Sequence, residues 1–237
     1  MNPRRDGKVA ALLCLLLGVI SAEPSSAGEA EFLAGTTRSC PNCALEGASL
    51  KRRDLTEADL SGANLARAVL HRARMPRVTL THADLREANL NKTDLKYAAA
   101  SEAKLPSAML YEADLGLADL TRADLSSAKM GRARLVRAKL DGAQLPRANL
   151  VGSSLRRADL EGANLDNAGL PDAVLTGANL KGANLSEADL MGADLTGANL
   201  SGADLSGARL TGAVLTGAVL DGAKLTGALM PDGSIHD

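Results

Sequence analysis

Aromatic residues are almost absent from this chain of 237 residues, which has no Trp, one Phe and two Tyr. The interior of a globular domain of this length normally draws on Phe, Tyr, Trp, Val and Ile, so the composition argues against an ordinary single-core enzyme. Neither sign of charge dominates, because 27 Lys and Arg stand against 28 Asp and Glu. This balance argues against a basic nucleic-acid binder and a uniformly acidic DNA mimic, and three aromatics cannot stack a strand of bases.

The one long apolar run, from Val9 to Ile20, has 12 residues and is too short to span a bilayer, which needs about 20. Basic residues precede the run and small residues follow it, which is the order of a secretory signal peptide. We expect residues 1–22 to be removed, with cleavage after Ala27 as the alternative. The mature protein would then lie in the bacterial periplasm or outside the cell, without a membrane span. A buried N-terminal helix or a retained anchor would produce the same pattern.

Cysteine and histidine are scarce, with three of each. Cys14 lies in the predicted signal peptide, so Cys40 and Cys43 are the only mature pair, and an oxidising compartment predicts a disulfide between them. Its small loop would contribute about 2 kcal/mol. A redox role is the alternative, and haem attachment is excluded because Ala44, not His, follows the pair. A zinc site would need two more ligands from His71, His82 and His236.

The sequence contains no grouping that indicates catalysis. It has no Ser-His-Asp arrangement, Gly-rich phosphate loop or His-based metal motif, so we expect neither an enzyme nor a cofactor or metal. The regular Asp and Asn residues described below could form a calcium ladder, but the glycine-rich nonapeptide pattern of such ladders is missing.

A five-residue repeat without insertions fills most of the chain. From Leu45 to Met230 every fifth residue is apolar, and 34 of these 38 central positions are Leu. The position two residues earlier is Ala in 33 of the 38 repeats, and the position between them is Asp or Asn in 18. The unit is A-(D/N)-L-x-x. We name its five positions, in order, small, polar, central, first corner and second corner.

This period restricts the possible folds. Five residues advance an α-helix by about 140° beyond a full turn, so the Leu side chains would scatter around the helix. In a flat strand, alternate Leu side chains would face opposite sides. If each repeat contains a turn that resets the phase, every central residue faces the same axis. The sequence therefore predicts a polygonal tube.

The unit resembles that of the pentapeptide-repeat proteins over residues 43–230. The resemblance implies an all-β fold, a right-handed quadrilateral β-helix in which four repeats make one coil and residues 20 apart stack. The 38 repeats would then make about 9.5 coils, and a spacing of about 4.8 Å between coils would give a rod of about 45 Å. Residues 23–42 would be a linker and N-terminal cap, and residues 231–237 a C-terminal tail.

The second corner differs between the two halves of the chain. It is Gly in 15 repeats, of which 13 lie beyond residue 140. Because Gly tolerates positive φ, the C-terminal half is predicted to use type II turns. The N-terminal half has charged residues there, such as Arg72 and Glu87, and is predicted to use other turns. Four first corners should point outward as Pro: Pro76, Pro106, Pro146 and Pro171.

Charge is also divided along the chain. Residues 40–157 have 20 basic and 13 acidic side chains, whereas residues 158–237 have 3 and 11. A predicted column in the basic half, with its neighbours, is a candidate patch for an anionic partner: Arg52, Arg72, Arg74, Lys92, Arg132 and Arg134. In the alternative interpretation this is a solubilising surface with local counter-ions, which are Asp54, Asp94 and Asp114.

A second predicted column places two apolar side chains between cations, in the order Arg77, Tyr97, Leu117 and Arg137. It is a candidate contact patch. The alternative is a set of isolated surface residues, which are common on soluble proteins.

The C-terminal end of the repeat should need a cover, because an open coil exposes the apolar interior and unpaired backbone groups. Only seven residues follow Met230, too few for an amphipathic helix. The polar position also becomes apolar near this end. We therefore expect two chains to meet end to end through Val214, Val219, Leu229 and Met230. In the alternative, Ile235 folds back and closes a monomer.

These features predict a non-enzymatic module or scaffold outside the cytoplasm that binds an unknown protein or envelope component and no nucleic acid. The resemblance implies an alternative function, that of a DNA mimic that inhibits DNA gyrase, because the family includes cytosolic members of this kind. Those members use Phe heavily at the central position and have a strongly acidic surface. Here Phe is absent from the repeats and half of the rod is basic.

Overall fold

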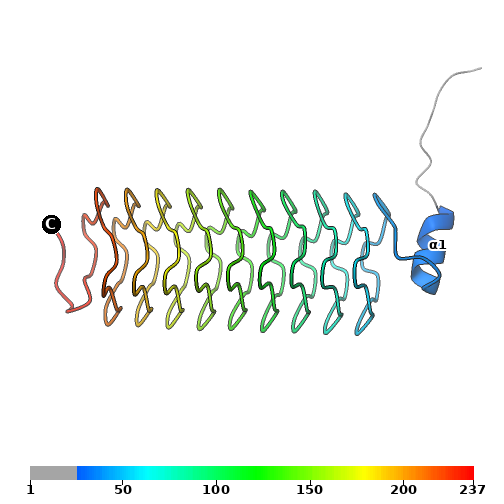
Figure 1. Cartoon of the computed structure of the whole chain (residues 1–237), viewed down its shortest axis with the longest axis horizontal. Coiled ribbons are helices and arrows are strands. Elements are labelled where there is room, and N and C mark those ends of the chain that lie inside the picture. The colour runs from blue at the N-terminus through cyan, green and yellow to red at the C-terminus, as the bar shows by residue number, and fades with distance from the viewer. Residues whose placement is uncertain (1–25) are drawn as a thin grey trace, which may run out of the picture.

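The computed structural model describes residues 26–237, which form a straight rod with a helix at its N-terminal end (Figure 1). This helix, α1, spans Ser26–Ala34 and lies in the segment expected to be a linker and cap. The predicted signal peptide lies outside the described residues. Among residues 26–237 no helix has the length and apolarity needed to cross a membrane.

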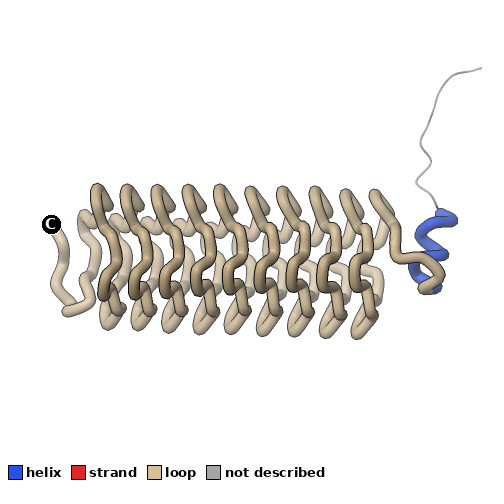
Figure 2. The backbone as a smooth tube through the Cα atoms, viewed as in Figure 1, coloured by secondary structure: helices blue, strands red, loops and turns tan. Residues whose placement is uncertain are grey.

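Parallel backbone bridges join residues 20 positions apart along the rod, from Ser39 with Asp59 to Arg209 with Leu229. Four repeats therefore make one coil, as the stacking prediction requires. The expected β-helix is thus present as a ladder of single-residue parallel bridges, because every bridge is isolated and the described residues contain no continuous strand (Figure 2). A turn in every repeat leaves each side of the coil too short for one.

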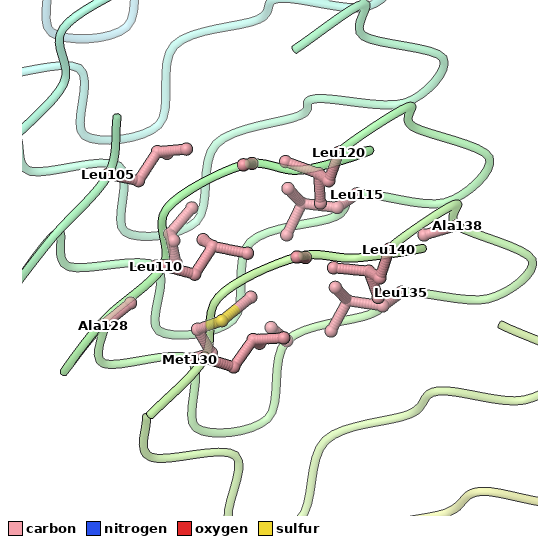
Figure 3. Close-up of a cluster of buried hydrophobic side chains, with 14 of the residues drawn as sticks. Leu105, Leu110, Leu115, Leu120, Ala128, Met130, Leu135, Ala138 and Leu140 are labelled. Carbon is pink, nitrogen blue, oxygen red and sulfur yellow. The ribbon is translucent and has the colours of Figure 1, made fainter. Parts of the chain in front are cut away.

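The interior is a continuous column of Leu and Ala side chains. In Figure 3 the central residues of two successive coils point to the same interior, and Met130 takes the place of a Leu beneath Leu110. Most central and small positions are at most 2% exposed. Each buried Leu contributes roughly 1.5–3 kcal/mol, so many small contributions replace the aromatic core that the chain lacks.

Between the two terminal coils, the backbone of each repeat donates three hydrogen bonds to neighbouring coils. The N–H groups of the central residue and of the second corner donate to the next coil, and that of the polar position donates to the preceding one. Leu65, for example, donates to the carbonyl of Asp84 at 2.6 Å. The small position closes the turn, as Ala68 does to the carbonyl of Leu65 at 3.0 Å. The N–H of the first corner is the one donor without a backbone acceptor.

Side chains at the polar position satisfy this remaining donor. In all 18 repeats with Asp or Asn there, Oδ1 accepts the N–H of the first corner at 3.0–3.3 Å. Pro has no N–H, and the polar position before each Pro corner of the repeats is neither Asp nor Asn: Arg74, Lys104, Gln144, Gly169 and Leu229. Backbone hydrogen bonding therefore explains the Asp and Asn pattern.

One turn geometry serves both halves of the rod, so the prediction of different turns is wrong. Every second corner from residue 42 to 227 has positive φ, which is 57° at Arg72, 57° at Glu87 and 64° at Gly182. Positive φ at this position alone, with the closing hydrogen bond, is the pattern of a type II turn. The stacked coils hold 23 non-Gly residues in this left-handed region, where each costs about 1 kcal/mol.

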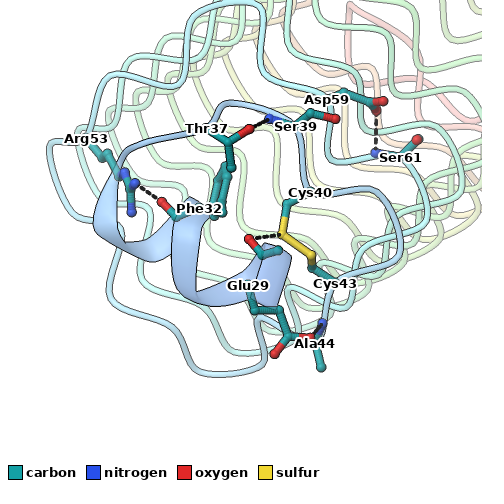
Figure 4. Close-up of a disulfide and its surroundings, with 11 residues drawn as sticks. Glu29, Phe32, Thr37, Ser39, Cys40, Cys43, Ala44, Arg53, Asp59 and Ser61 are labelled. Atoms are coloured by element: carbon teal, nitrogen blue, oxygen red, sulfur yellow. Dashed lines mark hydrogen bonds between the residues drawn. A yellow bond between two sulfur atoms is a disulfide. The ribbon is translucent and has the colours of Figure 1, made fainter. Parts of the chain in front are cut away.

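Helix α1 covers the N-terminal end of the rod (Figure 4). Phe32 is fully buried against the first coil, and the Arg53 guanidinium lies 4.9 Å from its ring centroid. Arg53 also donates to the last carbonyls of the helix, those of Phe32 and Leu33. Sequence reasoning missed this contact, although Arg53 interrupts the Ala of the small position and was therefore a visible signal.

The first coil would otherwise have unpaired backbone groups at this end. Oε1 of Glu29 on α1 accepts the N–H of Ala44 at 2.8 Å, a donor that has no preceding coil to bind. The predicted disulfide between Cys40 and Cys43 is present beneath the helix, with the two Cα atoms 5.4 Å apart. Helix and disulfide together hold the first turn of the rod.

Candidate interaction surfaces

The candidate sites lie on the outside of the rod, because Leu and Ala fill its interior. In the part of the chain that the structure describes, no three His, Cys, Asp or Glu side chains are arranged to hold a metal ion. Surface charge, exposed apolar groups and the two ends are therefore the features that could bind a partner.

One side of the rod is much more basic than the others. It comprises residues 51–57, 71–77, 91–97, 111–117, 131–137 and 151–157, and we call it the basic face. It has 13 basic and 5 acidic side chains, whereas all other residues between 40 and 157 have 7 and 8. The positive charge of the N-terminal half is therefore concentrated on a single side.

All six residues of the predicted anionic-partner patch lie on the basic face, in two neighbouring columns. Lys92 pairs with Glu112 at 3.1 Å, and Arg134 pairs with Asp114 at 3.6 Å. The other four form no salt bridge with any described residue and are exposed; they are Arg52, Arg72, Arg74 and Arg132.

In the alternative interpretation Asp54, Asp94 and Asp114 are counter-ions for the basic patch. Each of them accepts a hydrogen bond from the backbone N–H two residues later. Asp54 accepts the hydroxyl and the N–H of Thr56, and these hydrogen bonds, the hydroxyl first, lower the pKa of Asp54. Asp94 accepts the N–H of Lys96 at 3.2 Å. Only Asp114 forms ion pairs within the face, with the Lys96 ammonium at 3.3 Å and with Arg134. The basic face therefore keeps more cations than ion-pair partners.

The protonation states of His71 and Glu112 leave the excess of cations on the basic face in place. Desolvation, followed by the charges of Arg72 and Lys51, lowers the pKa of His71, so this side chain is neutral at neutral pH. The hydrogen bond from Lys92 lowers the pKa of Glu112, which stays ionised beside its partner.

The second predicted column forms one edge of the basic face. The Arg77 guanidinium lies 5.7 Å from the ring centroid of Tyr97 and also pairs with Glu57 at 3.4 Å. Tyr97 is 52% exposed and Leu117 is 46% exposed. Beside them is a hollow of about 210 Å³, whose other lining residues are Lys96, Asp114, Gly116, Arg134, Val136 and Arg137. The structure thus joins this column to the anionic-partner patch.

The residues of the expected dimer contact surround the last coil without forming one patch. Val214, Val219 and Leu229 lie on three different sides. Val214 and Val219 are exposed, whereas Leu229 and Met230 are half-buried. A second chain would therefore have to meet the end of the rod and not one of its sides.

The C-terminal tail folds back over one side of this coil. Ile235 forms an antiparallel bridge with Leu229, and Met230 donates to the carbonyl of Ser234 at 2.7 Å. Ile235 itself remains 68% exposed, so the tail pairs the backbone edge and does not fill the end of the tube.

The rest of the C-terminal edge is open. Donors that point to a next coil elsewhere in the rod have no acceptor among the described residues at Leu215, Gly217, Leu220, Gly222 and Leu225. The central Leu side chains of this coil are also partly exposed, unlike those of every preceding coil. The two ends therefore differ, since α1 covers one and a short tail partly covers the other.

A four-sided coil with a filled interior and a regular outer surface defines a β-solenoid of the quadrilateral class. The chain belongs to the pentapeptide-repeat family: the family model for pentapeptide repeats matches it in 8 copies. The matched residues are 43–81, 83–122, 118–157, 133–170, 158–197 and 193–230.

Solved structures of other pentapeptide-repeat proteins are similar to the chain. HetL from the cyanobacterium Nostoc sp. strain PCC 7120, a protein involved in heterocyst differentiation regulation, is 38% identical over 88% of this chain and 97% of its own, with a TM-score of 0.43. A thylakoid-lumen protein of Arabidopsis thaliana is 35% identical over 42% of this chain and 69% of its own, with a TM-score of 0.39.

QnrB1, a plasmid-mediated fluoroquinolone resistance protein, is 22% identical over 70% of this chain and 88% of its own. Its TM-score of 0.51 supports the fold alone. No curated protein matches the chain.

Proposed function

We propose that the protein is a non-enzymatic interaction module that acts outside the bacterial cytoplasm and binds an acidic protein segment through the basic face. The observation that carries this proposal is the concentration of cations without ion-pair partners on one side of a rod with a filled interior. Such a surface attracts an anionic partner over the Debye length and orients it along the rod.

Charge reversal tests the proposal. The variant Arg72→Glu, Arg74→Glu, Arg132→Glu should bind fluorescent poly-glutamate at least tenfold more weakly than the unmodified chain at low salt. The matched control is Lys104→Glu, Lys129→Glu, Lys139→Glu, which changes net charge equally on the other sides of the rod and should bind almost as well as the unmodified chain. Equal loss in both variants would mean that net charge alone governs binding.

The compartment is a separate part of the proposal. The order of charged, apolar and small residues at the N-terminus and the disulfide beneath α1 both support export. N-terminal sequencing of protein from its native host should give a start near Glu23 or Gly28. Cytosolic protein that begins at Met1 would contradict export.

We also propose an end-to-end homodimer through the last coil. Its support is the open backbone edge together with exposed Val214 and Val219 and half-buried Leu229 and Met230. Light scattering should give a mass that rises with concentration toward that of two chains, and Leu229→Asp should keep the chain monomeric. Thr176→Asp, in the body of the rod, is the control and should leave association unchanged.

DNA mimicry remains the second candidate function, favoured by the acidic C-terminal half with its 3 basic and 11 acidic side chains. A gyrase supercoiling assay separates the two candidates. We expect no inhibition, and inhibition at stoichiometric concentration would reverse the order.

A further inference from the structure

We infer that the hollow beside Tyr97 and Leu117 receives one apolar side chain of the acidic segment that binds the basic face. This inference rests on the proposed function and specifies the partner further. The two side chains occupy second corners in successive coils, where the Leu117 N–H donates to the carbonyl of Val136 at 3.0 Å.

Folding does not explain Leu117. Its φ is 59°, in the left-handed region that favours Gly, and its side chain is 46% exposed. The residue therefore gains little from burial and has an unfavourable backbone conformation. Among the 23 described non-Gly residues with positive φ, only Leu117 and Tyr97 are aliphatic or aromatic, and they are adjacent in one column.

Gly116 opens the floor of the hollow. Unlike the second-corner glycines, it does not have positive φ, so the turn does not require Gly there. The same column has side chains in the coils before and after, at Lys96 and Val136. An added Cβ would lie 3.2 Å from Oδ1 of Asp114 and 4.0 Å from Cγ of Lys96, and both residues line the hollow. Its volume of about 210 Å³ suits one large side chain and is below the usual range for a small-molecule site.

The charges around the hollow select an acidic neighbour for that side chain. Lys96 and Arg134 share the single carboxylate of Asp114, at 3.3 and 3.6 Å. Arg137 lines the hollow and forms no salt bridge with a described residue. Tyr and Arg around an apolar pocket are typical of the residues that dominate binding energy in protein interfaces.

A polypeptide suits this surface better than a nucleic acid. Binding of single strands needs successive aromatic side chains on which bases stack. Tyr97 and Tyr111 are the only exposed aromatics in the described part of the chain, and they lie at different corners. The six coils of the basic face extend about 24 Å at a spacing of about 4.8 Å, the length of a short extended peptide.

The test uses two labelled nonapeptides with Asp and Glu at every position except the centre, which is Phe in one and Ser in the other. Fluorescence anisotropy with the full chain should give about tenfold tighter binding for the Phe peptide. Leu117→Gly should abolish this preference without lowering the denaturation midpoint, because Gly relaxes the backbone. Ser127→Gly, which also introduces Gly at a second corner but away from the hollow, should retain the preference.

A second variant, Gly116→Val, fills the hollow with the side chain that Val136 places in the same column, and it should also abolish the preference. Equal binding of the two peptides by the unmodified chain would overturn the inference and leave the proposed function standing. A preference that persists in both Leu117→Gly and Gly116→Val would overturn the assignment to this hollow. If neither peptide binds the chain but a single-stranded oligonucleotide of similar length does, the inference and the proposed function are both overturned.

Discussion

The two halves of the rod differ in charge and in corner residues, but their backbones are alike. Before residue 140 the second corners are mainly charged or polar, and beyond it they are mainly Gly. All of them have positive φ, between 54° and 59° for the non-Gly residues and between 61° and 71° for the Gly corners beyond residue 140. The corner N–H donates to the next coil in both halves, at 2.9 Å for Arg72 and for Gly182.

This comparison indicates that stacking imposes the turn and that Gly only makes it less costly. Folding stability alone would favour Gly at every second corner. Folding stability therefore does not account for the side chains at the N-terminal corners, which include Tyr97, Leu117 and several cations without a salt bridge among the described residues.

The largest expected effect is the loss of stability when a central Leu is truncated, and it should be the same in both halves of the rod. Leu120 and Leu180 lie on the same side of the coil and are at most 1% exposed. Leu120→Ala and Leu180→Ala should each lower the free energy of unfolding by about 2–5 kcal/mol, through lost burial and the cavity left behind. Urea denaturation measures both. A much smaller loss in one half would mean that the interior is not uniform.

Exchanging corner residues should act in opposite directions. Ser127→Gly should raise the free energy of unfolding by about 1 kcal/mol, and Gly197→Ser should lower it by a similar amount. An added Cβ at Gly197 meets nothing within 4 Å, so the loss would be conformational. Ser206→Gly, at a first corner without positive φ, is the control and should not stabilise the chain. Stabilisation of all three variants would refute the argument from φ.

A double-mutant cycle isolates the hydrogen bond of the polar position. In the unmodified chain Oδ1 of Asn149 accepts the N–H of Val151 at 3.1 Å. Asn149→Ala removes this acceptor and should lower the free energy of unfolding by about 1 kcal/mol. With Val151→Pro already present there is no N–H to satisfy, so Asn149→Ala should cost almost nothing. Thermal and urea unfolding of the four chains give the coupling. Equal costs in both backgrounds would show that the amide acts in another way.

The smallest expected effect is the dependence of stability on acidic pH. Hydrogen bonds from the hydroxyls of Thr196 and Ser206 lower the pKa of Asp194 and of Asp204 below the unfolded value. Their contribution is therefore present above about pH 4 and is lost as the pH falls through the lowered pKa values. Asp194→Asn with Asp204→Asn keeps the acceptor and should reduce the difference in unfolding midpoint between pH 6 and pH 3. Asn184→Asp should increase that difference, and an unchanged difference in both would contradict the linkage.

Much of the fold was predictable because the repeat is local information. The central Leu and the small Ala specify an interior in every repeat. Which repeats stack followed from the unbroken count together with the four repeats per coil that the family resemblance implies. The disulfide followed from the only cysteine pair outside the predicted signal peptide. The Asp and Asn pattern was visible too, but its pairing with non-Pro corners became interpretable only when the structure left the first-corner N–H without an acceptor.

By itself the sequence determined the interior of the rod and its division into a basic and an acidic half, because both depend on residue type along an unbroken repeat. The register was predicted from the family resemblance, which implies four repeats per coil. Tertiary structure alone decided the common turn, the contact of Arg53 with α1 and the hollow beside Tyr97 and Leu117. These features depend on residues 20 or more positions apart. Their contacts exist only after the coils stack, when backbone hydrogen bonds between coils override the local preference of each corner residue.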